Sequence, residues 1–132
     1  MHKPQVILLV DDDPDDRDFF CEALRKSGHT NHVLHAENGA DAIAKLEKLQ
    51  KSGNLPCLII LDINMPIMDG RTALHKIREE MNLTETPIAI FTTTKPFDGE
   101  NLIHRYAIDI IEKPVSISGI ITEINRLLVK CL

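Results

Sequence analysis

Residues 57–70 read CLIILDINMPIMDG, and this stretch contains an unbroken apolar run that ends in an acid. Five apolar residues extend from Cys57 to Leu61, and Asp62 follows them directly. A run of this length and composition is typical of a buried strand. Burying a carboxylate is costly unless another group compensates its charge. The stretch therefore predicts a buried strand with a compensated carboxylate at its end.

Similar apolar runs occur elsewhere in the chain and alternate with segments of helical periodicity. They cover residues 5–10, 32–36, 87–92 and 108–112. Parallel strands that are covered on both faces have this nearly continuous apolar character. Alternating strands and helices with right-handed crossovers give an open, doubly wound sheet. The sequence thus predicts an α/β fold with a five-stranded parallel sheet and five helices.

The first predicted helix has a clear start. Asp13 is a good N-cap, Pro14 suits the first helical position, and the charges of Asp15 and Asp16 complement the helix dipole. Gly28 is suited to end the helix. We therefore expect a helix that begins at Pro14.

Length, charge and cysteine content exclude several classes of protein. The chain has 132 residues, so we expect residues 1–132 to form a single domain with no output domain. Its net charge of −5 argues against general attraction to nucleic acid or to an anionic membrane. No apolar stretch approaches the length of a membrane span. The three cysteines, an odd number without paired spacing, predict no disulfide framework and a reducing, cytoplasmic location.

Polar residues follow the predicted strands, where doubly wound sheets form their sites. Asp11 and Asp12 follow the first strand, and Asp62 follows the third. The fourth strand ends at Thr92, and Lys113 follows the fifth. If these strands are neighbours, the site contains several carboxylates, a hydroxyl and one ammonium group.

Crowded carboxylates need a cation. Two like charges ~4 Å apart repel by about 4 kcal/mol at an effective dielectric of 20, and one lysine does not balance three acids. Oxygen ligands favour Mg²⁺, or Mn²⁺, over zinc. An aspartate beside such an ion can accept a phosphoryl group, and Asp62 is the best candidate. Lys113 and the Thr92 hydroxyl would then stabilise the phosphoryl oxygens.

The motifs VILLVDDDPDD (6–16), IILDINMPIMDG (59–70), PIAIFTT (87–93) and EKP (112–114) resemble those of a response-regulator receiver domain. The resemblance covers essentially the whole chain. It implies a CheY-like fold with the strand order 2-1-3-4-5. It also implies that a sensor histidine kinase or a histidine phosphotransfer protein donates the phosphoryl group. The output would be an unknown protein target or a phosphorylation-linked homodimer, because no direct DNA binding and no membrane contact are expected.

The resemblance assigns a role to each matching residue. It implies phosphorylation of Asp62, a switch hydroxyl on Thr92, a pocket-lining backbone at Thr93, a phosphate-binding ammonium on Lys113, and metal ligation by Asp11, Asp12, Asp62 and the main-chain carbonyl of Asn64. The Lys113–Pro114 bond is typically cis in the family. Ile110 departs from the pattern, because receivers usually have an aromatic switch residue at this position.

Three alternatives compete with a phosphorylated switch that does not act as a turnover enzyme. A phosphatase of the haloacid-dehalogenase type also uses a strand-end aspartate and Mg²⁺, but its motif requires an acid where Asn64 stands. A receiver-like scaffold would act without phosphorylation, and Ile110 is the feature in its favour. The acidic run after the first strand also partly matches a calcium-binding EF-hand loop, but Asp16 stands where that loop needs glycine.

Overall fold

The computed structural model describes residues 5–131, and its sheet has five parallel strands in the order β2-β1-β3-β4-β5. The strands are β1 (Val6–Val10), β2 (His32–Ala36), β3 (Leu58–Leu61), β4 (Ile88–Thr92) and β5 (Asp109–Glu112). The helices are α1 (Pro14–Lys26), α2 (Gly39–Lys51), α3 (Gly70–His75), α4 (Gly99–Tyr106) and α5 (Ile117–Leu127). A π-helical turn (Lys76–Glu80) continues α3, and a 3₁₀ turn (Leu128–Cys131) follows α5. The predicted fold class and strand order are confirmed.

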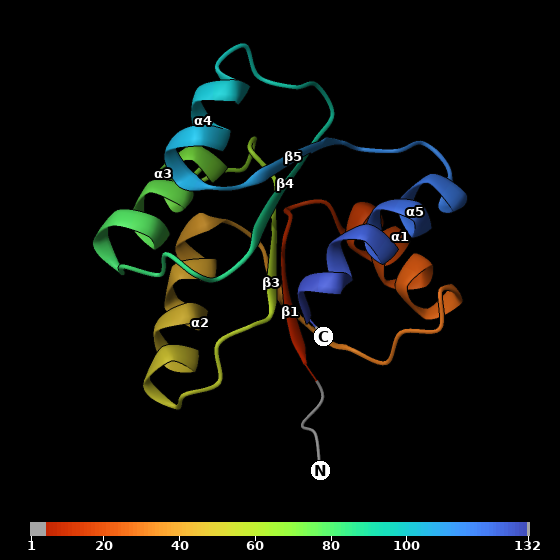
Figure 1. Cartoon of the computed structure of the whole chain (residues 1–132), viewed down its shortest axis with the longest axis horizontal. Coiled ribbons are helices and arrows are strands. Elements are labelled where there is room, and N and C mark those ends of the chain that lie inside the picture. The colour runs from red at the N-terminus through yellow and green to blue at the C-terminus, as the bar shows by residue number, and fades with distance from the viewer. Residues whose placement is uncertain (1–4, 132) are drawn as a thin grey trace.

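Helices cover both faces of the sheet, with α1 and α5 on one face and α2, α3 and α4 on the other (Figure 1). Alternation along β1 shows how the sheet supplies both cores. Ile7 and Leu9 pack into the cluster that contains residues of α1 and α5, whereas Leu8 and Val10 pack into the cluster on the opposite face. Because both faces are buried, the central strands contain almost only apolar residues.

The strand register places the predicted site residues at one edge. Val10 pairs with Leu61, and the backbone N–H of Asp62 donates to the Val10 carbonyl at 3.1 Å. Farther along the sheet, between β4 and β5, Thr92 pairs with Glu112, and the Lys113 N–H donates to the Thr92 carbonyl at 2.7 Å. The residues that follow β1, β3, β4 and β5 therefore meet at the carboxyl edge, as expected for a doubly wound sheet.

Helix α1 begins where the sequence predicts. The Asp13 carboxylate accepts a hydrogen bond from the Asp15 N–H at 2.9 Å, and Pro14 is the first helical residue. At the other end Gly28 adopts φ +84°, a conformation that favours glycine and ends the helix. The Asp13 cap at the start of α1 fixes the path of the acidic segment between β1 and α1.

The expectation that no disulfide forms is wrong. Cys57 and Cys131 are bonded, with a Cα–Cα distance of 5.1 Å, and Cys21 is free. Cys57 directly precedes β3, and Cys131 ends the 3₁₀ turn after α5. The two are 74 residues apart in sequence, and they meet only because α5 packs back across the sheet. Cysteine count and spacing contain no trace of that packing.

The expected cis bond at Lys113–Pro114 is also wrong, because no peptide bond among residues 5–131 is cis. The trans form of an X–Pro bond is favoured by only about 0.5–1 kcal/mol, so the local sequence hardly decides the isomer. Within the same residues, no helix has the length and apolar character needed to cross a bilayer.

Loss of the disulfide should lower stability. Replacing Cys131 with Ser removes a cross-link over a long loop, so we expect the free energy of unfolding to fall by roughly 2–4 kcal/mol. Urea unfolding without reductant measures this, and dithiothreitol should bring the wild type down to the level of the variant. Cys21→Ser is the control and should change little. Three titratable thiols in the air-oxidised folded protein would contradict the pairing.

Candidate functional site

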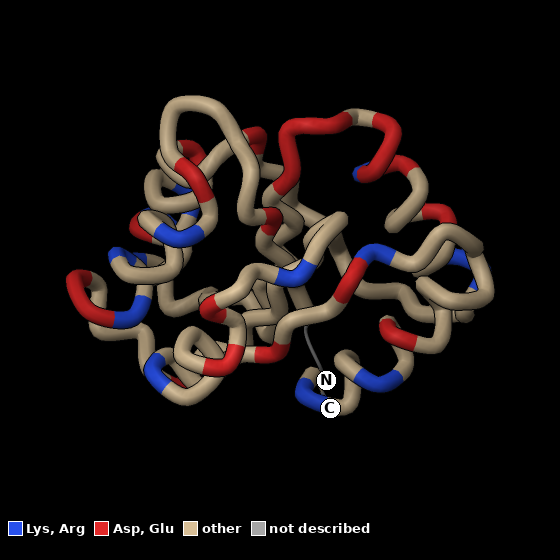
Figure 2. The backbone as a smooth tube through the Cα atoms, turned by 90° about the horizontal axis from the view of Figure 1, so that it is seen from above, with Lys and Arg blue, Asp and Glu red and all other residues tan. Residues whose placement is uncertain are grey.

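Three carboxylates gather at the carboxyl edge of β1 and β3. One oxygen from each of Asp11, Asp12 and Asp62 lies within 4.8 Å of the other two. Asp11 and Asp62 are buried and Asp12 is exposed, so the cluster opens to solvent on one side. The acidic run from β1 into α1 is visible as a red stretch of the tube in Figure 2. The three side chains predicted to ligate a metal therefore come together, and their oxygens suit a hard divalent cation.

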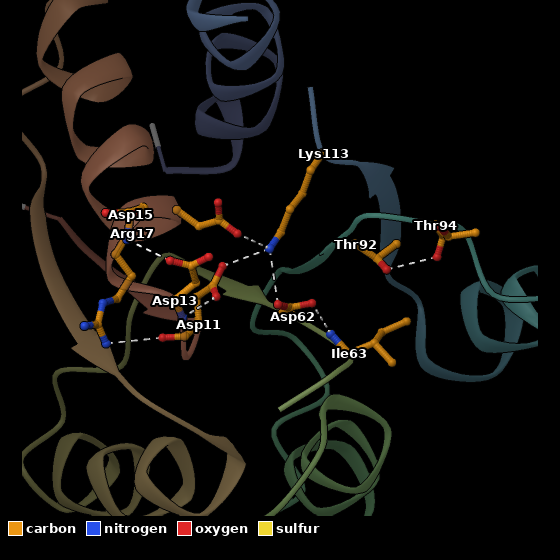
Figure 3. A network of polar contacts seen from close by, with 10 residues as sticks. Asp11, Asp13, Asp15, Arg17, Asp62, Ile63, Thr92, Thr94 and Lys113 are labelled. Carbon is orange, nitrogen blue, oxygen red and sulfur yellow. Dashed lines mark hydrogen bonds and ion pairs between the residues drawn. The ribbon is translucent and has the colours of Figure 1, made fainter. Parts of the chain in front are cut away.

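Lys113 extends from the end of β5 into this cluster (Figure 3). Its Nζ lies 3.1 Å from Asp11 Oδ2, 3.2 Å from Asp62 Oδ2 and 2.8 Å from Asp16 Oδ2. Burial alone would lower the pKa of Lys113, but the hydrogen bond that its ammonium group donates to Asp16 and the charges of Asp11 and Asp62 outweigh burial and raise that pKa above its ordinary value. The ammonium group therefore stays charged beside Asp11 and Asp62 of the cluster.

Asp11 shows the cost of burying a carboxylate. Burial raises the pKa of Asp11 above its ordinary value, although the Asp13 backbone N–H and the Lys113 ammonium group oppose the shift. That N–H donates to Asp11 Oδ1 at 3.0 Å. Because Lys113 is shared among three acids, the carboxylates remain short of positive charge, and this favours uptake of a further cation.

Both oxygens of Asp62 have partners. Oδ1 accepts the backbone N–H of Ile63 at 2.7 Å, and Oδ2 contacts Lys113. Thr92 is only 1% exposed, and its hydroxyl donates to the Thr94 carbonyl at 3.0 Å, as Figure 3 shows. In this arrangement the Thr92 hydroxyl is paired with its own loop.

Two predicted pocket residues lie in the loops around the cluster. Thr93 follows Thr92 and is exposed, and Asn64 is exposed two positions after Asp62. Exposure at the pocket rim is compatible with the roles implied for their backbones. A metal bond to the Asn64 carbonyl and a phosphate contact at Thr93 stay predictions.

The sequence reasoning missed two residues of the site. Asp16, assigned only to the helix dipole, makes the shortest contact to Lys113. Gly70 packs directly under Asp62: a Cβ at this position would lie 2.8 Å from the Ile63 Cα and closer still to the Asp62 carbonyl oxygen. The only local signal for Gly70 is its place directly after Asp69, whose carboxylate caps α3. No local signal marks Asp16.

The fold and the carboxylate pocket together define a doubly wound α/β domain with an acidic, lysine-containing site at its carboxyl edge. A family profile described as the response regulator receiver domain matches residues 7–125. The chain therefore belongs to the response regulator receiver family.

Relatives with curated descriptions agree with this assignment. PilH of Pseudomonas aeruginosa is 32% identical over 124 residues, which cover 92% of this chain and 96% of PilH. Response regulator Rcp1 of Synechocystis is 34% identical over 93 residues, which cover 69% of this chain but only 63% of Rcp1. A protein-glutamate methylesterase/protein-glutamine glutaminase of Archaeoglobus fulgidus is 36% identical, and the chain spans 34% of its length. The family thus includes enzymes in which the matching part is a minor portion.

Solved structures share the fold. The crystal structure of the phosphorylated cyanobacterial phytochrome response regulator RcpA superposes with a TM-score of 0.81 at 26% identity, covering 96% of this chain and 92% of that one. The Mn²⁺-bound form of response regulator Rcp1 gives a TM-score of 0.78 at 26% identity, covering 95% and 92%. The acidic cluster of this chain is chemically suited to the same class of ion.

Gly70→Ala should disturb the site by pushing against the backbone of Asp62 and Ile63. The added methyl group clashes with the Asp62 backbone, so we expect a loss of roughly 1–3 kcal/mol in stability together with weaker binding of Mg²⁺. Gly99→Ala is the matched control. Gly99 also opens a helix, and its Cβ would meet side chains rather than backbone, with Ile110 at 3.4 Å and Pro96 at 3.8 Å. Urea unfolding and calorimetric titration measure both effects, and equal behaviour of the two variants would contradict the close approach at Gly70.

Proposed function

We propose that this chain is a phosphorylation-operated switch of two-component signalling and that Asp62 accepts the phosphoryl group. One observation carries the proposal: the Asp62 carboxylate ends a buried strand with an ammonium group 3.2 Å away and two further carboxylates beside it. The donor is a phosphohistidine on a sensor histidine kinase or a histidine phosphotransfer protein. We also propose a cytoplasmic location, where such donors present their phosphohistidine. This proposal rests on the donor chemistry alone, because the Cys57–Cys131 disulfide removes the cysteine argument for a reducing compartment.

The chemistry assigns a task to each residue. An Asp62 oxygen forms the new bond to phosphorus as the bond from phosphorus to the donor nitrogen breaks. Lys113 supplies fixed positive charge to the phosphoryl oxygens, and the Thr92 hydroxyl, at the end of the neighbouring strand β4, bonds one of them. Asp11, Asp12, Asp62 and the Asn64 carbonyl would hold Mg²⁺ or Mn²⁺. When bound, that ion would neutralise charge on the phosphoryl oxygens.

Phosphorylation would change the face formed by α4, β5 and α5. To reach a phosphoryl group, the Thr92 hydroxyl must leave the Thr94 carbonyl, which moves the loop before α4. A cavity of about 550 Å³ lies beyond that loop and is lined by Phe97, Ile103 and Ile110 among others. Ile110 is half-buried there, so loop and helix have room to repack without an aromatic switch residue. This face would bind the protein target or a second copy of the chain.

The rival functions fit less well. A phosphatase of the haloacid-dehalogenase type needs a second acid where the exposed Asn64 stands. A scaffold that acts without phosphorylation would not need Lys113 in contact with both Asp11 and Asp62. We therefore propose a protein that accepts one phosphoryl group and hydrolyses it, without turning over an external substrate and without binding DNA.

The phosphoacceptor can be tested by intact mass. After incubation with acetyl phosphate and Mg²⁺, we expect one phosphoryl adduct that is labile to hydroxylamine. The adduct should be absent without Mg²⁺ and absent in Asp62→Asn, because that amide is not a nucleophile. Asp69→Asn is a control that changes an acid outside the cluster and should keep the adduct.

Two results would contradict the proposal. The absence of an adduct, under conditions in which another receiver domain reacts, would favour the scaffold. Sustained hydrolysis of a phosphomonoester in excess over protein would favour the phosphatase.

Amide exchange tests the switch. Addition of beryllofluoride and Mg²⁺ should alter exchange rates within residues 92–115, because the Thr92 loop, α4 and β5 respond together. Thr92→Ala should reduce this response while leaving Asp62 able to accept a phosphoryl group. Unchanged exchange in residues 92–115 of the wild type would rule out the switching face.

A further inference from the structure

Lys113 and a divalent cation need the same carboxylates. Lys113 contacts Asp11 at 3.1 Å and Asp62 at 3.2 Å, and both acids belong to the three-carboxylate cluster. A cation bound there would compete with the ammonium group for these oxygens and would repel it. If Lys113 had no other partner, uptake of the ion would leave a half-buried ammonium group poorly compensated.

Asp16 contacts Lys113 but does not belong to the carboxylates for which Lys113 and a cation compete. Its Oδ2 lies 2.8 Å from Lys113 Nζ, which is shorter than either contact to the cluster, and Asp16 is not one of the three clustered acids. Its side chain is 41% exposed, compared with 7% for Asp11 and 11% for Asp62. The ammonium group thus already has a contact on the more solvated side of the pocket. This contact uses none of the three carboxylates that would bind the cation.

Space for a shift of Lys113 exists beside this contact. A cavity of about 40 Å³ is bordered by Asp11, Asp16 and Lys113, and its remaining lining is mostly apolar, including Phe19 and Phe91. The alkyl part of a lysine packs well against apolar walls while its charged end stays at a polar rim. The cavity therefore leaves room for the Lys113 side chain to shift away from Asp11 and Asp62 while its ammonium group keeps the contact with Asp16.

We propose that Asp16 is a positioning residue that holds the Lys113 ammonium group at the pocket wall when Asp11, Asp12 and Asp62 bind a divalent cation, so that ion and lysine occupy the pocket together. This inference rests on the cation site of the proposed function. It differs from a helix-dipole role for Asp16, because Asp15 shares the first turn of α1 but is not a partner of Lys113.

A double-mutant cycle on Mg²⁺ affinity tests the inference. Calorimetric titration with MgCl₂ alone would compare wild type, Asp16→Asn, Lys113→Met and the double variant, with Asp15→Asn as the control for charge loss. We expect Asp16→Asn to weaken Mg²⁺ binding at least about threefold more than Asp15→Asn, since Lys113 then remains on Asp11 and Asp62. Lys113→Met should strengthen binding, and in that background Asp16→Asn should lose its excess effect.

Equal weakening by Asp16→Asn and Asp15→Asn, or the same excess effect with and without Lys113, would overturn the inference and leave the proposed function intact. Failure of the wild type to bind Mg²⁺ would overturn both. Urea unfolding in EDTA shows which variants are folded. If Asp16→Asn did not fold, Asp16→Ser in place of Asn would serve in the same cycle, because serine retains helix-start capacity but offers the ammonium group no charge.

Discussion

The contact of one ammonium group with three carboxylates is the interaction on which the site depends. Lys113 bridges the ends of β1, β3 and α1, so a single positive charge makes the burial of Asp11 and Asp62 tolerable. The balance stays negative, and this deficit is what makes the pocket receptive to a divalent cation. Electrostatics thus sets both the stability of the resting pocket and its chemistry.

The sheet gives this pocket its precision. β1 and β3 are covered on both faces, and their register fixes Asp11 and Asp62 side by side. Gly70 brings the start of α3 against the Asp62 backbone and leaves it little room to move. The Thr92 loop and the surroundings of Ile110 are less closely packed. A rigid carboxylate pocket beside an adaptable loop is the combination that a chemical switch requires.

The sequence correctly predicted which strand-end residues lie together at the edge of the sheet. Asp62, Asp11 and Lys113 each follow an apolar run, and parallel strands bring such positions to one edge. It failed for Asp16 and for the pairing of Cys57 with Cys131. The direction of the Asp16 side chain depends on how α1 lies relative to β5. The cysteine pairing depends on how α5 crosses the sheet.

The sequence by itself determined the alternation of strands and helices, the start of α1 at Pro14 and the set of acids at the strand ends. These follow from periodicity and local hydrogen bonding, which neighbouring residues control. Only the tertiary structure decided which acids share Lys113, which cysteines join, and that Thr92 bonds its own loop. Such contacts depend on helix packing and on small differences in energy between alternative partners, which no short stretch of sequence encodes.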